Sequence, residues 1–158
     1  MTSVRDLIET AFENVSYPGD ANIIRCSCYL CRAAAKYFRG TRWQTHTLKR
    51  LCEYQLAISS FTPEAFLYFL PAYMLQSLDA WGSSALIPFL ITKQFLPPRM
   101  SEDPQRIQAH AKRMALLSPA QRQAVIAYLR AYKESGTALV DRDIEEAIAY
   151  LSNSSATC

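Results

Sequence analysis

The sequence predicts a single all-α domain, a compact bundle of about seven or eight helices around a central helix kinked by a proline. Three observations support this fold class. The chain has 158 residues, the size of one ordinary domain. Half of the residues are hydrophobic and 20% are charged, which excludes an intrinsically disordered chain. With 4 glycines the chain lacks the frequent turns of a β-sandwich, and apolar residues recur at helical spacing along most of its length.

The first two helices are predicted from apolar stripes and from the turns that end them. Residues 3–14 carry apolar side chains at the three- and four-residue spacing of one helix face. A turn follows in which Gly19 supplies a positive φ. The second helix is predicted over residues 27–38 and is expected to end at Gly40, where a left-handed conformation closes many helices.

The middle of the chain contains the expected core. A third helix is predicted over residues 48–59. Thr62 and Pro63 then mark a helix start, because threonine caps the free N–H groups and proline needs no hydrogen bond in the first turn. Apolar residues lie nearly all around the helix over residues 61–78, which indicates a helix surrounded by others, and Pro71 is expected to kink it.

The remaining helices are predicted at four places: over residues 84–95, from Pro104, from Pro119 and from about Asp141. Ser118 and Gln121 have the spacing of a reciprocal capping box at the start of the helix from Pro119. We therefore expect one helical domain over residues 1–152 and a flexible tail over residues 153–158.

The sequence also indicates a compartment. The first thirty residues contain no apolar run of the secretory type, and the longest apolar stretch, residues 61–75, is too short to span a membrane. Five cysteines is an odd number, and three of them lie within residues 26–31, which favours reduced thiols over a disulfide framework. We expect a soluble cytoplasmic protein that does not contact membranes.

The net charge of +3 conceals two basic segments. Residues 25–50 hold seven basic and no acidic residues, whereas residues 93–133 hold eight basic and two acidic residues. The acidic segments between and beyond them could pack against both, which would neutralise the charge within the fold. Alternatively, the first basic segment forms an exposed face for an acidic partner. The sequence leaves this choice open.

The cysteines raise the possibilities of a metal site and of a thiol enzyme, and the sequence supports neither. A closed zinc site usually takes two pairs of ligands, and only Cys28 and Cys31 form such a pair, so we interpret both as small buried apolar residues. Cys26 and Cys28 lie near a helix start and near basic residues, which would lower a thiol pKa. Neither His46 nor His110 has an acidic neighbour that would orient it as a base. We therefore predict no catalytic residue, no metal and no cofactor.

A nucleic-acid interface is the alternative that the first basic segment raises. Its cations are interleaved with Tyr29, Tyr37, Phe38 and Trp43, and single strands bind to cations and aromatic rings together. Tyr37, Phe38 and Trp43 suit a protein core equally well, so this function remains the alternative rather than the main prediction.

The sequence resembles a bacterial family of unknown function. The resemblance rests on Tyr17-Pro18-Gly19-Asp20, the Cys28-x-x-Cys31 pair, the run from Phe38 to Trp43, and the run from Thr62 to Tyr73, and it covers about residues 10–135. Tyr29 and Leu30 stand between the paired cysteines where the family pattern has acidic residues. The resemblance implies the helical fold but carries no activity. By analogy with small bacterial proteins of this kind, it suggests an immunity protein that accompanies a toxin.

These observations predict a non-catalytic protein-binding module, an immunity protein that binds and inhibits a cognate bacterial toxin domain. Because a cleft built for nucleic acid would itself be positive, a toxin acting on a nucleotide cofactor, a peptide or a protein fits a basic inhibitor better. A nucleic-acid or ligand-binding helical module is the alternative, ahead of a thiol or zinc protein. The candidate partner-binding residues are Tyr17, Arg32, Lys36, Arg39, Arg42, Trp43 and Arg99.

Overall fold

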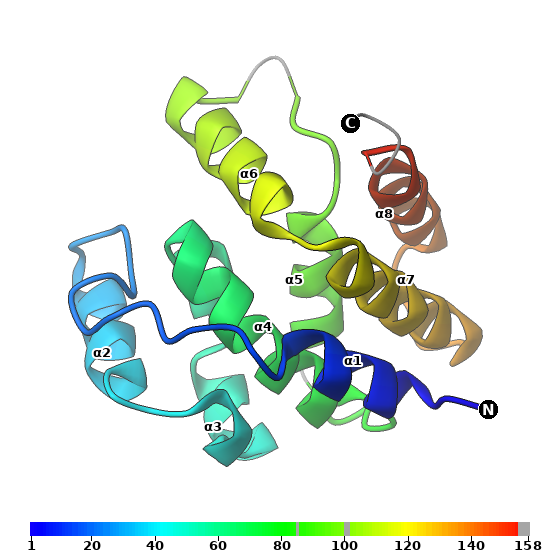
Figure 1. Cartoon of the computed structure of the whole chain (residues 1–158), viewed down its shortest axis with the longest axis horizontal. Helices are drawn as coiled ribbons and strands as arrows, with labels where there is room; N and C mark the ends of the chain where they lie inside the picture. The colour runs from blue at the N-terminus through cyan, green and yellow to red at the C-terminus, as the bar shows by residue number, and fades with distance from the viewer. Residues whose placement is uncertain (85, 100–101, 155–158) are drawn as a thin grey trace.

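The computed structural model describes residues 1–84, 86–99 and 102–154, and this part of the chain folds into an all-α bundle (Figure 1). It contains eight α-helices and two short 3₁₀ helices, η1 and η2. In chain order they are α1 (Val4–Phe12), α2 (Tyr29–Phe38), η1 (Trp43–Thr45), α3 (Leu48–Glu53), η2 (Gln55–Ser59), α4 (Pro63–Ser77), α5 (Ile87–Gln94), α6 (Pro104–Leu116), α7 (Pro119–Glu134) and α8 (Asp141–Ser154).

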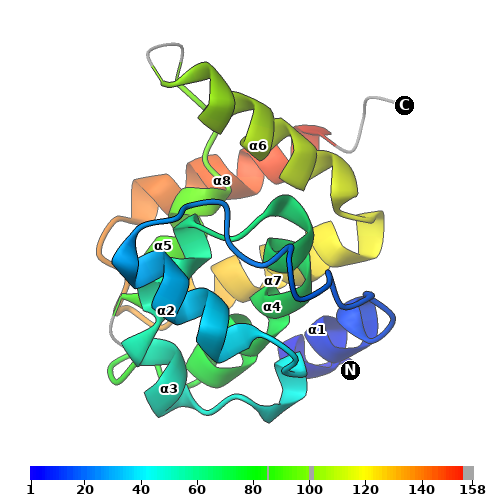
Figure 2. The same cartoon turned by 90° about the vertical axis from the view of Figure 1, so that its left-hand side faces the viewer.

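Helix α4 is the centre of the bundle, as the sequence predicts. It packs against α1, α3, α5, α6 and η1, and almost all of its side chains are buried. Figures 1 and 2 show α4 and α5 between α2 and α3 on one side and α7 and α8 on the other. Helix α1 packs across α4 and α7. The molecule is therefore layered around a helix that is apolar on every side.

The start of α4 follows the predicted pattern. The Thr62 hydroxyl accepts a hydrogen bond of 3.1 Å from the Ala65 amide, and Pro63 occupies the first helical position. The helix continues through Pro71 up to Ser77. No helix in the described part of the chain, α4 included, combines the length and the apolar character that crossing a membrane requires.

Other predicted helix ends are confirmed. Ser118 and Gln121 form the reciprocal capping box at the start of α7, with hydrogen bonds of 3.1 and 2.9 Å. Gly19 has a φ of 99° in the loop after α1. Gly40 has a φ of 70° just beyond α2, where a left-handed residue ends the helix.

Some boundaries differ from the prediction. The helix predicted over residues 48–59 is interrupted at Tyr54. At this point the Tyr73 hydroxyl donates a 2.8 Å hydrogen bond to the Tyr54 carbonyl, and the Tyr54 ring stacks on Tyr37. The helix predicted from residue 84 begins at Ile87. Helix α8 continues through Ser154, beyond the predicted start of the tail, and residues 155–158 lie outside the described part of the chain.

Candidate functional site

The candidate site is a groove, and an isolated antiparallel β-bridge positions the residues of its first wall. Ile24 pairs with Phe61, and the Arg25 amide donates a 3.0 Å hydrogen bond to the Ser60 carbonyl. The Arg25 guanidinium then reaches two further carbonyls, from Nη2 to Ser59 at 3.0 Å and from Nε to Phe61 at 3.2 Å. The bridge therefore fixes a basic residue of the first segment at the end of η2.

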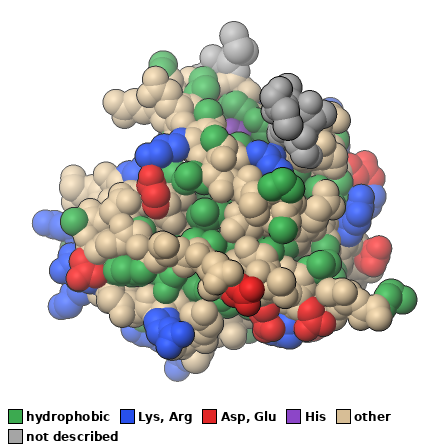
Figure 3. All heavy atoms as spheres, viewed as in Figure 1, with side chains coloured by type: hydrophobic (Ala, Val, Ile, Leu, Met, Phe, Trp, Pro, Cys, Tyr) green, Lys and Arg blue, Asp and Glu red, His purple; other side chains and the backbone are tan. Residues whose placement is uncertain are grey.

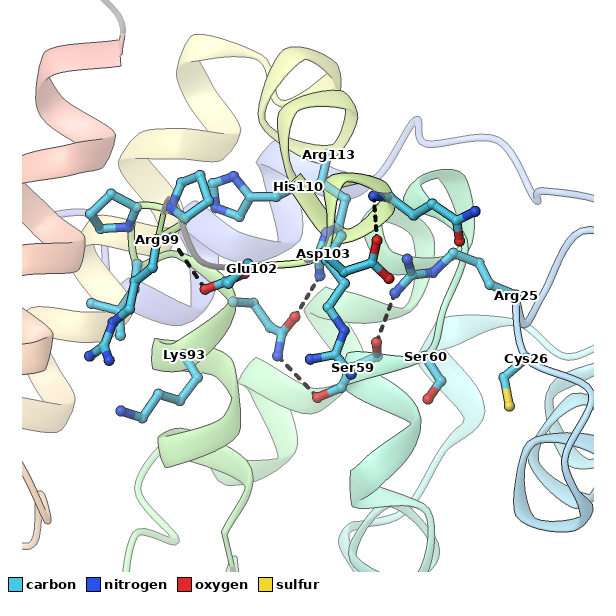
Figure 4. Close-up of a pocket in the computed structure, with 16 residues that line it drawn as sticks. Arg25, Cys26, Ser59, Ser60, Lys93, Arg99, Glu102, Asp103, His110 and Arg113 are labelled. Carbon is cyan, nitrogen blue, oxygen red and sulfur yellow. Dashed lines mark hydrogen bonds between the residues drawn. The ribbon is translucent and has the colours of Figure 1, made fainter. Parts of the chain in front are cut away.

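Beside Arg25 lies an open groove of about 950 Å³. Segment 96–99 and helix α6 form its other walls, and α5 contributes its last turn. Figure 4 shows Arg25 and Cys26 at one end of the groove and Arg99 at the other. Its charged lining residues are Arg25, Lys93, Arg99, Glu102, Asp103, Arg106 and Arg113. The two basic segments of the sequence therefore meet in this groove.

Arg113 is the buried cation of the groove. The residue is 8% exposed, its Nη1 donates a 2.5 Å hydrogen bond to Gln94 Oε1, and its guanidinium lies 4.9 Å from the centre of the Phe66 ring. Its Nε has no hydrogen-bond partner among the described residues. Burial and the nearby charge of Arg25 lower the pKa of Arg113 to about 10, so it remains protonated at neutral pH. Buried arginines are usually paired with an acid, and this one faces another arginine.

The two carboxylates in the groove do not neutralise its arginines. Glu102 accepts a hydrogen bond of 3.3 Å from the backbone of Arg99, and Asp103 caps α6 by accepting one of 3.0 Å from Gln105. Lys93 pairs with Asp143 of α8 at 2.5 Å. Within the described residues, no carboxylate lies within ion-pair distance of any of the four groove arginines.

His110 is a further buried polar side chain in the groove, beside Arg113 and Gln94. The residue is 6% exposed, and neither ring nitrogen forms a hydrogen bond of normal geometry, although the Leu96 backbone lies beside the ring. Burial first, and then the charge of Arg113, lower the pKa of His110, so the imidazole is neutral at pH 7. A neutral imidazole has one donor and one acceptor, and in His110 both nitrogens are buried without an ordinary hydrogen bond to the described residues.

The exposed face of α2 carries the second group of cations. Arg32, Lys36 and Arg39 are exposed and share the predicted helix face, and Arg42 is exposed just beyond the helix. In the described part of the chain, none of these four side chains forms an ion pair. Figure 3 shows Lys and Arg side chains along the edge of the molecule where α2 and α3 lie. We call these four residues the α2 cationic face.

The two basic segments differ in how far acidic residues of the fold neutralise them. The second segment makes three ion pairs with acidic segments: Lys93 with Asp143, Lys112 with Glu64, and Lys133 with Glu145. In the first segment, the described residues form one ion pair, the local one between Arg50 and Glu53. The second segment is therefore partly neutralised by the fold, whereas most cations of the first segment form no ion pair among the described residues.

Two of the candidate partner-binding residues, Trp43 and Tyr17, make contacts within the fold. Trp43 is only 6% exposed and belongs to the core, so its assignment as an exposed partner-binding residue is wrong. The aromatic ring anchors the link between α2 and α3 against α4. Tyr17 is half-buried, and its hydroxyl donates to Asp20 at 2.6 Å and accepts from the Gly40 amide at 2.7 Å. Arg99 is exposed, but it lies in the groove and not on the α2 cationic face.

The cysteines are arranged differently from the sequence interpretation. Cys31 is buried as expected, but Cys28 is exposed because it is the N-cap of α2 and not part of its apolar face. The sulfur atoms of Cys26, Cys28 and Cys31 all lie within 4.8 Å of one another. His46 is not close to them: it is buried between the Tyr37 hydroxyl, at 2.8 Å, and the Thr41 hydroxyl, at 3.0 Å.

Comparison with known proteins places the chain in a family without assigning it an activity. No curated protein matches it, and no solved structure does. The sequence profile of DUF6714, which is described as a family of unknown function, matches residues 2–154, so the chain belongs to this family.

Proposed function

We propose that the chain is a non-catalytic protein-binding module that receives an acidic surface of another protein in its groove and against its α2 cationic face. The observation that carries this proposal is Arg113, a buried charge with Arg25 nearby and with no carboxylate of the described residues within ion-pair distance. An uncompensated buried charge destabilises a fold, and a bound anion would remove that penalty. The side chain is thus prepared for a negative group supplied from outside.

The lining of the groove favours carboxylates over nucleic-acid bases. It has no Phe, Tyr or Trp among its described residues, so it offers no ring on which bases could stack. Arginine guanidinium groups match carboxylates through two parallel hydrogen bonds. At the start of α2, Tyr29 and Leu30 are exposed by 77% and 67%, and exposed aromatic and aliphatic side chains are typical anchors of protein interfaces.

The narrower form of the proposal is that the partner is a bacterial toxin domain and that this chain is its immunity protein in the cytoplasm. A basic inhibitor would be repelled by a cleft that binds nucleic acid, since that cleft is itself positive. A toxin that acts on a nucleotide cofactor, a peptide or a protein fits the charge of the groove better. The alternative is a module that binds nucleic acid or a small anionic ligand.

Binding of two polyanions of equal charge tests the general proposal. We expect a polyglutamate peptide to bind more tightly than a thymidine oligonucleotide when each is titrated by calorimetry at about 50 mM and about 200 mM salt. Arg25→Ala and Arg113→Met should each weaken peptide binding by about tenfold. Arg130→Ala removes an exposed cation of α7 outside the groove and should change the affinity by less than about twofold.

Three outcomes of this titration would contradict the proposal. They are binding of neither polyanion, preference for the oligonucleotide, and equal losses in Arg113→Met and Arg130→Ala. Preference for the oligonucleotide would support the alternative function.

Co-expression tests the narrower proposal. The protein encoded by the neighbouring open reading frame should arrest the growth of a host cell, and this chain should restore growth and copurify with it. A variant in which Arg32, Lys36, Arg39 and Arg42 are replaced by glutamate should fold but fail to protect, because these exposed cations form no ion pair in the described part of the fold. A harmless neighbour that does not copurify would overturn the immunity proposal and leave the peptide titration unaffected.

A further inference from the structure

Three cysteines that are close in sequence come together in space at the start of α2. Their sulfur atoms all lie within 4.8 Å of one another. In a tetrahedral zinc site with Zn–S bonds of about 2.3 Å, the sulfurs are about 3.8 Å apart. The three sulfurs are thus at most about 1 Å farther apart than in such a site.

The backbone around these cysteines is fixed on both sides. Cys26 follows Arg25, whose backbone and side chain are bonded to the end of η2. Cys28 is the N-cap of α2, and Cys31 lies in its first turn, buried against the core. The Cys28 amide also donates a 3.3 Å hydrogen bond to the Cys26 sulfur. The first turn of α2 therefore fixes the positions of Cys28 and Cys31, and the hydrogen bonds of Arg25 fix the backbone next to Cys26.

The surroundings favour a thiolate at Cys28 and a thiol at Cys31. The pKa of Cys28 is lowered to about 7, first by the Cys26 side chain and then by the Cys31 backbone N–H and side chain. Burial raises the pKa of Cys31, so its proton would leave only when a cation binds. No acidic residue occurs between residues 21 and 52, whereas Arg25 and Arg32 flank the three cysteines. The surrounding charge therefore suits an anionic metal–thiolate centre.

We propose that Cys26, Cys28 and Cys31 form a three-thiolate site for one thiophilic metal ion, with Zn²⁺ as the ion that best fits. An all-sulfur donor set excludes ions that prefer oxygen ligands, such as Mg²⁺ and Ca²⁺. No His, Asp or Glu of the described residues joins the group, so water or a side chain of a partner fills the fourth position.

This site would act on the neighbouring groove. Cys26 lines the groove together with Arg25, so the ion would lie at that end of it (Figure 4). A metal that joins Cys26 to α2 would restrain the segment that carries Arg25. Because the folded chain presents the three ligands together, the ion would also stabilise the fold.

Metal titration of the reduced, full-length chain tests the site. Cys158 lies outside the described residues and is replaced by serine in all variants. We expect one equivalent of Co²⁺ to bind and give an intense thiolate-to-metal charge-transfer band, and one equivalent of Zn²⁺ to abolish that band. Zn²⁺ should also raise the midpoint of thermal unfolding.

Substitutions identify the ligands. Cys26→Ser and Cys28→Ser should each weaken Zn²⁺ binding by about 100-fold, because each removes one of three ligands. Both residues are exposed, so these variants should keep the helical content of the parent chain, whereas Cys31→Ser changes a buried position. Cys52→Ser is the matched control, because Cys52 is a free cysteine of α3 outside the group, and it should leave the affinity unchanged.

The proposal would be overturned by reduced chains that bind no stoichiometric Zn²⁺ or by equal losses in Cys26→Ser and Cys52→Ser. It would also be overturned if two of the three cysteines formed a disulfide in air and the reduced chain bound no metal. The acidic-peptide titration is performed on metal-free protein, so failure of the metal site and failure of the proposed function are distinguishable.

Discussion

Arg113 on α6 donates a hydrogen bond of 2.5 Å to Gln94 on α5. Gln94 in turn donates from its Nε2 to the Ser59 hydroxyl at 3.1 Å. This chain of contacts connects α6, α5 and the end of η2 beneath the groove, where Arg25 also bonds to Ser59. The connection holds a cation in place without neutralising it, which is the arrangement that a binding site for an anion requires.

The contribution of Arg113 to stability should therefore come from its hydrogen bond to Gln94 and not from its charge. Arg113→Met leaves Gln94 Oε1 buried without a donor and should lower the free energy of unfolding by about 1–3 kcal/mol. The double variant Arg113→Met, Gln94→Leu removes both partners and should unfold close to the parent chain. Urea denaturation measures both effects. If the double variant is less stable than the single one, the arginine has a structural role that the groove does not explain.

A buried hydroxyl pair ties α4 to α7. The Tyr128 hydroxyl and the Ser77 hydroxyl are 2.7 Å apart, and Ser77 also bonds to the Tyr73 carbonyl at 2.7 Å. Tyr128→Phe should cost about 1 kcal/mol, because Ser77 keeps its other partner. Ser77→Ala should cost about 1–3 kcal/mol, because it leaves the Tyr128 hydroxyl buried and unpaired. Chemical denaturation of both variants and of the double variant should show that the two costs do not add.

His46 should make stability depend on pH. Burial lowers its pKa to about 4, below the ordinary value of about 6.5. Between these values the unfolded chain binds a proton that the folded chain does not, so stability present above pH 6.5 is lost as the pH falls towards 4. We expect this residue to account for a loss of about 2 kcal/mol between pH 7.5 and pH 5.

The pH effect is measured by urea denaturation of the parent chain and of His46→Gln at several pH values. The variant should lose less stability over this range. His110→Gln is the companion variant, because the pKa of His110 is also lowered by burial. Parallel curves for the parent chain and His46→Gln would contradict the assignment.

The capping box of α7 gives a local stability prediction. Ser118→Ala removes the acceptor for the Gln121 amide and should lower the free energy of unfolding by about 1 kcal/mol. Ser16→Ala changes an exposed serine in a loop and should have an effect below about 0.5 kcal/mol. Thermal unfolding followed by circular dichroism distinguishes the two. Equal effects would mean that the cap does not contribute.

Much of the fold could be predicted because its signals are local. Caps and prolines mark the starts of α4, α6 and α7, and the apolar surface of the helix after Pro63 identifies the centre of the bundle. The prediction failed where a distant residue decides the local structure. The helix expected over residues 48–59 stops at Tyr54, where the Tyr73 hydroxyl bonds to the Tyr54 carbonyl, and no pattern within the segment indicates that contact.

The candidate site could be predicted only in part for the same reason. The α2 cationic face follows from helical spacing, since Arg32, Lys36 and Arg39 recur at one side of a helix. The groove depends on the bridge between Ile24 and Phe61 and on the packing of α6 against α4, so Arg25 and Arg113 could not be brought together from their sequence positions. Arg113 directly precedes Met114, and both side chains are buried in the structure. Nothing in the sequence indicates which groups the Arg113 side chain faces.

The enclosed position of α4 has a consequence for genetic screens. The guanidinium of Arg113 lies over the Phe66 ring of this helix, so a change at Phe66 should displace a residue that we propose to bind the partner, although Phe66 itself would not touch a ligand. Random mutants selected for loss of binding should be enriched in substitutions along α4. If every such position were taken to contact the partner, these buried residues would be misassigned. Measuring abundance beside activity for each mutant would separate the two classes.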